Sequence, residues 1–368
     1  VLRFLRCATL VAGMNIPRAL LAALAGSLLF APFLGAAEHS TSIELLSQPY
    51  TIDRKYKSME GPSGIQPITL THADPPELLW ITGYRVAVVG ADGTSPASQE
   101  FMCHNNLDFT DVSLHNQLFR TTNPITPRLF TLSQGQFSIQ FPKGFGLPVL
   151  SNEPLSLATQ VLNHNVEHPN VQVRHKVTVD FVRDQDVERP MKPLFSIAPF
   201  VMVLLEGTDG YFGMSETEAA GTHASGCLPG VHASSQTSGD LHSDQFGRKF
   251  SGHWVVKPGR QVNAMPITKW MNSLLDDTTL HYVAVHVHPY AQTLELRDVT
   301  TGTPVFTSHI TNFPDRIGVA TVEAYSSTEG TPIYKNHEYE LVSVYDNPTG
   351  VEQDAMATFF LYLLDKDF

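Results

Sequence analysis

The stretch HYVAVHVHPY, residues 281–290, decides how this chain is interpreted. Valines alternate with other residues through it, and a period of two is typical of a β-strand whose two faces differ. The alternation predicts one face formed by Tyr282, Ala284, His286 and His288, and an opposite face formed by Val283, Val285 and Val287. Two imidazoles on one face, two residues apart, can clamp a single metal ion. The alternative interpretation is a pair of half-buried histidines that hydrogen-bond to their neighbours.

Strand-like segments continue on both sides of this stretch. They are short, rich in β-branched and aromatic residues, and separated by turn signals such as GADG, DVTTG and DNPTG. No long segment keeps a helical period. The segments are WITGYRVAVVG, QEFMCHNNLDF, QFSIQF, VQVRHKVTVDFV, TLELRDV, YELVSVYD and ATFFLYLL. The sequence therefore predicts an all-β protein built of β-sandwiches.

The N-terminal residues 1–37 have the composition of an export signal. Arg3, Arg6 and Arg18 precede an apolar run, LLAALAGSLLFAPFLG, which ends in small residues. We predict cleavage after Ala37 and a periplasmic or extracellular mature protein. An uncleaved anchor is the alternative, and association with a membrane is expected only in that case.

Residues 38–368 form a longer chain than a single hydrophobic core usually supports. The stretch VERPMKP, residues 187–193, combines charge with two prolines and is the candidate boundary. We predict two jelly-roll-like β-sandwich domains, 38–190 and 191–368. Residues 207–252 are rich in Gly, Ser, Thr and His, a composition that cannot bury enough apolar surface to fold alone, and they are predicted to form a loop inserted into the second domain.

Charge and cysteine usage narrow the partners. The net charge is −12, and loss of the leader, which carries basic but no acidic residues, makes the mature chain more acidic. Such a surface argues against nucleic acid as a partner. Cys103 and Cys227 remain in the mature chain, and in an oxidising compartment they are candidates for one disulfide.

The last apolar segment, AMATFFLYLL, carries a second potential ligand. Its alternation places Met356, Thr358, Phe360 and Tyr362 on one side. A methionine in such a strand is normally part of the core. A thioether is a soft ligand, however, and a set of two histidines and one methionine suits copper, above all in its reduced state.

Two motifs together resemble a known family. The segment LHYVAVHVH, followed some seventy residues later by Asp354-x-Met356, resembles the copper type II, ascorbate-dependent monooxygenases, which include the peptidylglycine α-hydroxylating and dopamine β-hydroxylating enzymes. VVKPGRQVN before the histidine pair and HEYELVSVYDNPTG before Asp354 extend the resemblance in the same order. It covers most of residues 75–368 and is strongest in the second predicted domain.

The resemblance implies a fold, a cofactor and a ligand set. Two packed β-sandwich domains would each present copper to a cleft between them. His286, His288 and Met356 would hold the second-domain copper, where O2 is activated for C–H hydroxylation with electrons from ascorbate or another small reductant. The first-domain copper would take His104 and His164, with Asn105 as a candidate substitute where the family has a second consecutive histidine. One or two copper ions are therefore expected.

Other departures concern the substrate and the first site. His168 and His175 are less favoured stand-ins for His164. Ala284 occupies the place of an arginine that holds the peptide carboxylate in the peptide-hydroxylating enzymes, which argues against a peptidylglycine substrate. The expected substrate is a small molecule or another compound that the sequence does not identify.

Two further hypotheses stay open. The incomplete first site and the histidines His223, His232, His242 and His253 in or beside the insertion favour a non-catalytic copper binder for storage, delivery or resistance in the cell envelope. In that case the insertion would be a lid or a copper-capture segment rather than a solvated loop. The other hypothesis is a metal-free jelly-roll module for adhesion or carbohydrate binding.

Overall fold

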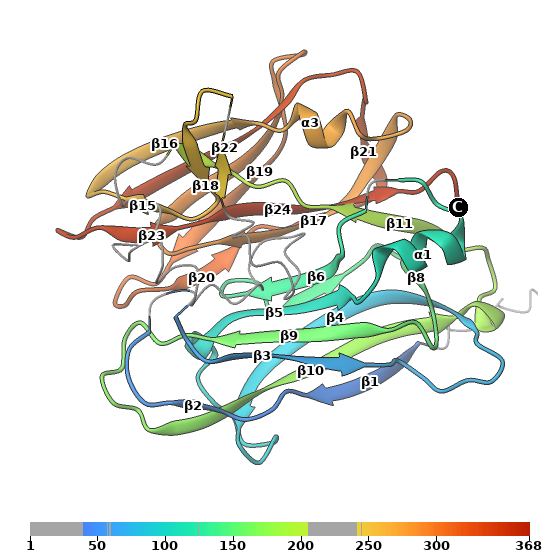
Figure 1. Cartoon of the computed structure of the whole chain (residues 1–368), viewed down its shortest axis with the longest axis horizontal. Helices are drawn as coiled ribbons and strands as arrows, with labels where there is room; N and C mark the ends of the chain where they lie inside the picture. The colour runs from blue at the N-terminus through green and yellow to red at the C-terminus, as the bar shows by residue number, and fades with distance from the viewer. Residues whose placement is uncertain (1–39, 57, 59, 124, 205–240, 244) are drawn as a thin grey trace, which may run out of the picture. The chain divides into compact units, whose positions relative to one another are not determined.

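Strands dominate the structure because β-branched and aromatic residues alternate with polar ones over most of the chain. The computed structural model describes residues 40–368 except 57, 59, 124, 205–240 and 244 (Figure 1). The predicted leader lies outside the described residues, as does most of the predicted insertion, including His223, His232 and Cys227. The all-β prediction is confirmed.

The largest sheet runs through both predicted domains. Its strands follow in the order β1 (Thr41–Leu46), β10 (Val171–Arg183), β4 (Leu78–Gly90), β8 (Phe145–Leu150), β11 (Lys192–Ile197), β24 (Ala357–Leu364), β17 (Thr278–Val287) and β21 (Tyr325–Ile333), with β2 (Tyr50–Ile52) beside β10 and β7 (Ser138–Gln140) beside β4. Strand β11 begins within the predicted boundary stretch, residues 187–193. It pairs in parallel with β8 and antiparallel with β24, so the two halves share one sheet.

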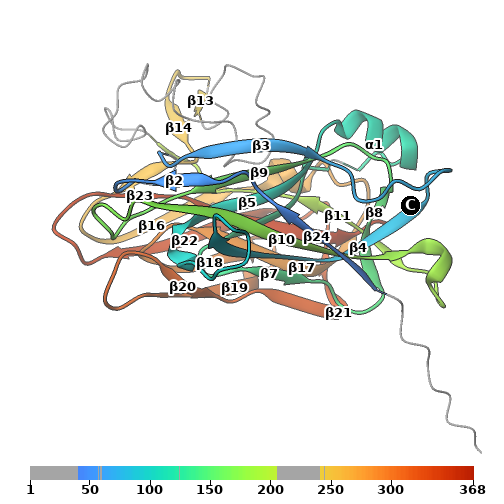
Figure 2. The ribbon, with the colours of Figure 1, turned by 90° about the horizontal axis from the view of Figure 1, so that it is seen from below.

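Smaller sheets complete two sandwiches (Figures 1 and 2). A four-stranded sheet covers the N-terminal half, in the order β3 (Ser63–Ile68), β9 (Leu155–Val161), β5 (Met102–Phe109) and β6 (Arg128–Ser133). A five-stranded sheet covers the C-terminal half, in the order β16 (Gly259–Pro266), β22 (Tyr339–Asn347), β18 (Ala291–Asp298), β19 (Thr303–Asn312) and β20 (Val319–Val322). Two short sheets follow, β15 (Trp254–Val256) with β23 (Gln353–Ala355), and β12 (Val203–Leu204) with β14 (Lys249–Ser251) and β13 (Leu241–Ser243).

Helical segments in the described residues are short. They are α1 (Val112–Phe119), α3 (Thr268–Met271) and 3-10 turns at Gln99–Phe101 and Asp184–Asp186. Helix α1 begins after Asp111, whose side chain accepts a hydrogen bond from the Leu114 N–H, and ends at Arg120 in the left-handed region. None of the helices among the described residues has the length and apolar character needed to cross a membrane.

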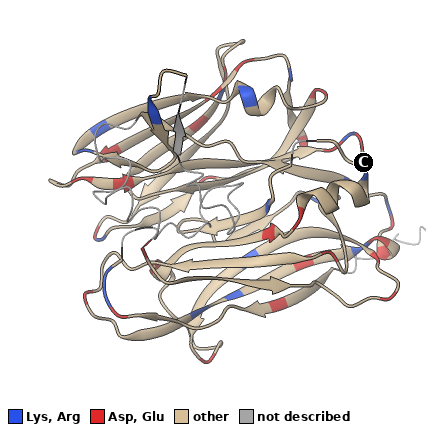
Figure 3. Cartoon of the chain, viewed as in Figure 1, with Lys and Arg blue, Asp and Glu red and all other residues tan. Residues whose placement is uncertain are grey.

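Two hydrophobic cores lie on the two faces of the shared sheet. Strand β17 contributes to both, since Tyr282 and Ala284 belong to the N-terminal core and Val283, Val285 and Val287 belong to the C-terminal core. The alternation predicted for this strand is therefore confirmed. Strands β17 and β24 carry no Lys, Arg, Asp or Glu, whereas Figure 3 shows charged residues in connections and along other strands. The face of β17 and β24 that meets the N-terminal core also carries the candidate metal ligands.

Candidate metal centre

The pairing of β17 with β24 brings the three second-domain candidates to one face. His286 lies directly across from Thr358, and one pair further along the His288 N–H donates to the Met356 carbonyl at 3.2 Å. Directly opposed residues of an antiparallel pair point to the same side of the sheet. The side chains of His286, His288 and Met356 are therefore expected on one face of the sheet. Tyr282 and Ala284 lie on the same face and belong to the N-terminal core.

The two imidazoles are buried and close together. His286 and His288 are each 3% exposed, and Met356 is fully buried. The ring centroids of His286 and His288 are 5.4 Å apart and the rings are nearly perpendicular, at 89°. With metal–nitrogen bonds of about 2.0 Å, two imidazoles that bind one ion keep their centroids within roughly 6.4 Å. The spacing of this pair is compatible with a shared ion.

His286 leaves both of its ring nitrogens without a hydrogen-bond partner among the described residues. The Thr358 hydroxyl across from it likewise has no hydrogen-bond partner among the described residues. A buried polar atom that is left unmatched costs about 1–3 kcal/mol, so native proteins seldom keep several in one place without a ligand, ion or water. Such a group of unmatched buried atoms is compatible with a metal site.

His288 is oriented by Asp354. Its Nδ1 lies 2.8 Å from the Asp354 Oδ2, although the angles are not those of a well-directed hydrogen bond. Burial raises the pKa of Asp354, but the His288 contact and the nearby His164 outweigh that effect and hold it well below its usual range. The carboxylate is therefore charged. A carboxylate behind one ring nitrogen is the usual support of a metal-binding histidine and leaves Nε2 for the ion.

The backbone around Met356 is fixed by Tyr345. The Tyr345 hydroxyl donates to the Met356 carbonyl at 2.6 Å and accepts from the His288 N–H at 3.3 Å. Phe200 and Met356 form a small buried cluster, against which Met202 and Trp270 pack. These contacts hold the strand junction and keep water away from the thioether.

Burial keeps His286 neutral. It lowers the pKa of His286 well below the ordinary value, and neighbouring imidazoles and Arg128 lower it further. A neutral imidazole has a lone pair available, which is the form that binds a metal ion. The electrostatics thus favour metal binding over protonation.

The first-domain candidate His104 has a different environment. It is buried in β5, its Nδ1 lies 3.1 Å from the Asn106 amide nitrogen, and its Nε2 lies 3.0 Å from the Gln160 Oε1. Because the amide nitrogen of Asn106 can only donate, the proton of His104 resides on Nε2. Burial, with Arg128 nearby, lowers the pKa of His104 to about 3. Both ring nitrogens already have protein partners.

Asn105 points away from His104, to the opposite face of β5. Its Oδ1 accepts a hydrogen bond from the Tyr84 hydroxyl. Its Nδ2 lies 3.1 Å from the Thr159 hydroxyl and 3.3 Å from the His175 Nδ1. The structure therefore does not bring Asn105 to His104 as a replacement ligand, because successive residues of a strand face opposite sides. The stand-in His175 is bound into this same network.

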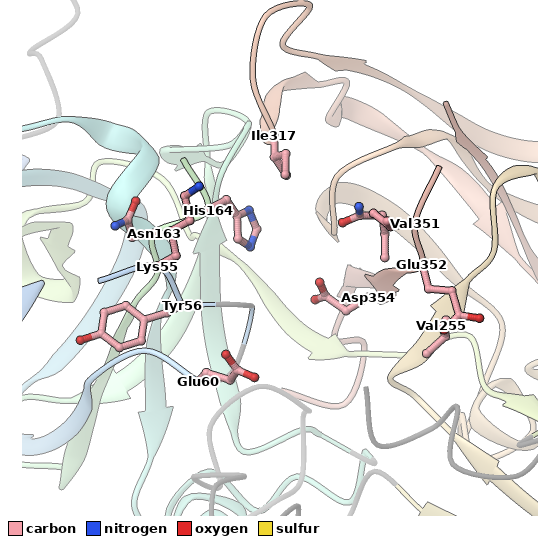
Figure 4. A pocket seen from close by; sticks show the side chains of 11 residues that line it. Lys55, Tyr56, Glu60, Asn163, His164, Val255, Ile317, Val351, Glu352 and Asp354 are labelled. Atoms are coloured by element: carbon pink, nitrogen blue, oxygen red, sulfur yellow. The ribbon is translucent and has the colours of Figure 1, made fainter. Parts of the chain in front are cut away.

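His164 lies beyond the end of β9 and faces a cavity of 540 Å³. Asp354 faces the cavity from the other side, as Figure 4 shows. Both halves contribute to the lining, with Lys55, Tyr56, Glu60, Asn163 and His164 from the first and Val255, Ile317, Val351, Glu352, Gln353 and Asp354 from the second. The His164 Nδ1 has no hydrogen-bond partner among the described residues. His164 and His104 therefore have separate surroundings, and the cavity reaches the carboxylate that contacts His288.

Three residues near the centre were not predicted as part of it. His253, directly after the predicted insertion, is buried, and its ring centroid lies 5.8 Å from that of His288. Asp354 was predicted only as part of a motif, and no role was predicted for Tyr345. The Asp-x-Met spacing could have indicated Asp354, since residues two apart on a strand share a face. Nothing local to His253 indicates its position.

Two further predictions concern His168 and a disulfide of Cys103. His168 is exposed, with its Nδ1 3.4 Å from the Asp53 carbonyl. Cys103 is buried, and its predicted partner Cys227 lies outside the described residues, so the disulfide stays a prediction. In the part of the chain that the structure describes, no three or more His, Cys, Asp or Glu side chains are grouped so as to hold a metal ion. A set of two histidines and a methionine is not such a group.

Known proteins resemble this chain only in fold, with low TM-scores and low sequence identity. No protein-family model matches the chain, and no curated protein matches it in sequence. Among solved structures, PNGase F, a glycosylasparaginase from Flavobacterium meningosepticum, has a TM-score of 0.35 at 9% identity and covers 88% of this chain and 96% of its own. PBCV-1 VP54 has a TM-score of 0.33 at 9% identity, covering 90% and 96%. Likenesses at these TM-scores carry no argument about function.

Proposed function

We propose that this chain is a copper protein of the monooxygenase type, with copper held by His286, His288 and Met356. The observation that carries the proposal is the buried ring of His286, whose two nitrogens have no hydrogen-bond partner among the described residues. It shares a face with a second imidazole and a thioether. A fully buried imidazole of this kind is costly unless an ion or ordered water meets it.

Copper is favoured over other metals by the donor set. A thioether is a soft ligand that selects copper(I), whereas zinc and the hard cations prefer thiolate, imidazole or oxygen donors. Asp354 holds the Nδ1 side of His288, so Nε2 is the nitrogen directed at the ion. When bound, copper would cycle between its two oxidation states and activate O2. His286, His288 and Met356 would hold it and exclude water.

The proposed reaction is the hydroxylation of a C–H bond in an organic substrate. One oxygen atom of O2 enters the C–H bond and the other leaves as water, with two electrons and two protons taken from ascorbate or another small reductant. The cavity of 540 Å³ is the candidate substrate site, because Asp354 in its wall contacts His288. We also propose that the protein acts after export, in the periplasm or outside the cell, and that nucleic acid is not a partner.

A second candidate is favoured by the first-domain residues. The ring nitrogens of His104 are engaged by Asn106 and Gln160, and Asn105 faces the other way. Without a second copper, electrons must reach the His286 site directly from the reductant. A non-catalytic copper binder for storage, delivery or resistance in the cell envelope needs no such delivery, and it is the alternative to the enzyme.

Copper content and oxygen uptake test the proposal together. Purified protein is loaded with copper(I), washed, and analysed for metal, and oxygen uptake is followed with ascorbate and a panel of small organic substrates. We expect one copper per chain and an uptake that requires both copper and reductant. Met356→Ala should abolish the uptake, and Met265→Ala, a change on the edge strand β16, should not.

The outcomes separate the candidates. Copper binding that is lost in Met356→Ala, without oxygen uptake on any substrate, selects the non-catalytic binder. Protein that retains no copper after loading, with an unchanged far-ultraviolet spectrum, removes both copper hypotheses and leaves a metal-free β-sandwich module.

A further inference from the structure

His253 lies near both Met356 and His288 in the fold. Strand β15 pairs with β23 so that Trp254 is across from Ala355; His253 directly precedes Trp254, and Met356 directly follows Ala355. The His288 N–H donates to the Met356 carbonyl at 3.2 Å. The backbones of His253 and His288 therefore both lie near Met356.

The rings of His253 and His288 lie close to each other. The centroids of His253 and His288 are 5.8 Å apart, with an angle of 44° between the rings. This separation is within the roughly 6.4 Å that two imidazoles can span across one ion with bonds of about 2.0 Å. His253 is 1% exposed and is also close enough to His286 for its charge to act on that ring. A third imidazole is thus within reach of the proposed site.

The oxidation state of copper decides when a third imidazole is useful. Copper(I) is satisfied by few, soft donors, which two imidazoles and a thioether supply. Copper(II) prefers a tetragonal arrangement with more nitrogen or oxygen donors. In the described residues, His253, His286 and His288 are not already grouped as a three-donor metal site. A change in the side-chain torsions of His253 is therefore part of any ligation by it.

We propose that His253 is an additional ligand of the His286, His288 and Met356 site and that it binds the oxidised ion. The inference rests on the proposed copper function. It gives the last residue before β15 a role in stabilising copper(II), so that the site gains an imidazole when the ion is oxidised and releases it on reduction.

Spectroscopy of the copper(II) protein tests this assignment. Full-length wild type, His253→Ala, His253→Gln and His286→Ala are each loaded with one equivalent of copper(II), and pulsed electron paramagnetic resonance counts the bound imidazoles. We expect three in wild type and two in both His253 variants. Affinity for copper(II), measured by chelator competition, should fall at least about tenfold in both. Affinity for copper(I), measured anaerobically, should change less than about threefold.

Matched variants separate this inference from the proposed function. His309→Ala removes an exposed histidine bonded to Glu323 and should leave every value unchanged. His253→Gln keeps a polar side chain at this position and carries the test if His253→Ala does not fold. Two imidazoles in wild type, or equal copper(II) affinity in wild type and His253→Gln, overturns the role of His253 while the copper site stands. No copper bound by wild type overturns both.

Discussion

The chain carries two groups of buried histidines, and their hydrogen bonds differ. In β5, each ring nitrogen of His104 lies within hydrogen-bonding distance of an amide side chain. In β17, His286 has no such partner among the described residues, although it is equally buried. Burial of histidine alone therefore does not indicate a metal site. The informative difference is whether the buried polar atoms have hydrogen-bond partners within the protein.

Copper affinity should separate the two groups most strongly. His286→Ala removes a direct ligand, and we expect affinity for copper(I) to fall by more than about 100-fold, beyond the 10–100-fold typical of losing a supporting residue. His104→Ala should change it by less than about threefold, because the nitrogens of His104 bind Asn106 and Gln160. Anaerobic competition with a coloured copper(I) chelator measures both. Equal losses would mean that the first group also binds copper.

Stability should show the opposite order. Asn105→Ala removes three hydrogen-bonding contacts at once, to Tyr84, Thr159 and His175, in a buried site. We expect the free energy of unfolding to fall by about 2–4 kcal/mol, since the buried partners are left unmatched. Urea denaturation measures the change, with Asn336→Ala, an exposed turn residue, as the control expected within about 0.5 kcal/mol of wild type. A loss as small as the control's would show that water replaces the amide.

Acid should lower the stability of the protein through His175, which lies within hydrogen-bonding distance of Asn105. Burial lowers the pKa of His175 to about 3, below the value of about 6.5 expected in the unfolded chain. The unfolded state therefore binds the proton first, and stability that is present above pH 6.5 is lost as the pH falls towards 3. The contribution approaches about 1.4 kcal/mol per pH unit. His175→Asn should reduce the slope of unfolding free energy against pH by this amount between pH 6 and 4.5, and an unchanged slope would contradict it.

The local sequence pattern predicted which side chains share a strand face. The period of two placed His286 and His288 on one face of β17, and it also placed Met356 and Thr358 together on the last strand, because side-chain direction in a strand depends only on the residue count. The same rule, applied to β5, separates Asn105 from His104. The family pattern had set these two residues side by side as ligands, and strand geometry is the stronger guide.

Long-range pairing could not be predicted in this way. Strand β11 joins β8 to β24, and β15 pairs with β23, through hydrogen bonds between segments far apart in the sequence. The second pairing leaves His253 with its ring close to that of His288. Backbone hydrogen bonds carry no residue code, so a sequence does not state which strand is the neighbour. For the same reason Asp354 could be recognised as a motif residue but not as the support of His288.

The smallest expected effect is also the most direct test of the unmatched ring. In metal-free protein, His286→Leu replaces a buried polar ring by an apolar side chain. We expect the free energy of unfolding to stay equal or to rise by up to about 1 kcal/mol, because removal of unmatched buried polar atoms offsets imperfect packing. His104→Leu should instead lower it, since Asn106 and Gln160 each lose a contact.

Copper should reverse the order of wild type and His286→Leu. A ligand present at 100 times its dissociation constant stabilises the folded state by about 2.7 kcal/mol, and only a protein with an intact site receives this increment. Denaturation of both proteins with and without copper(I) measures the crossing. If His286→Leu were clearly less stable than wild type in the absence of metal, the His286 ring would already be matched by water or protein, and the site would lose the feature that distinguishes it from β5.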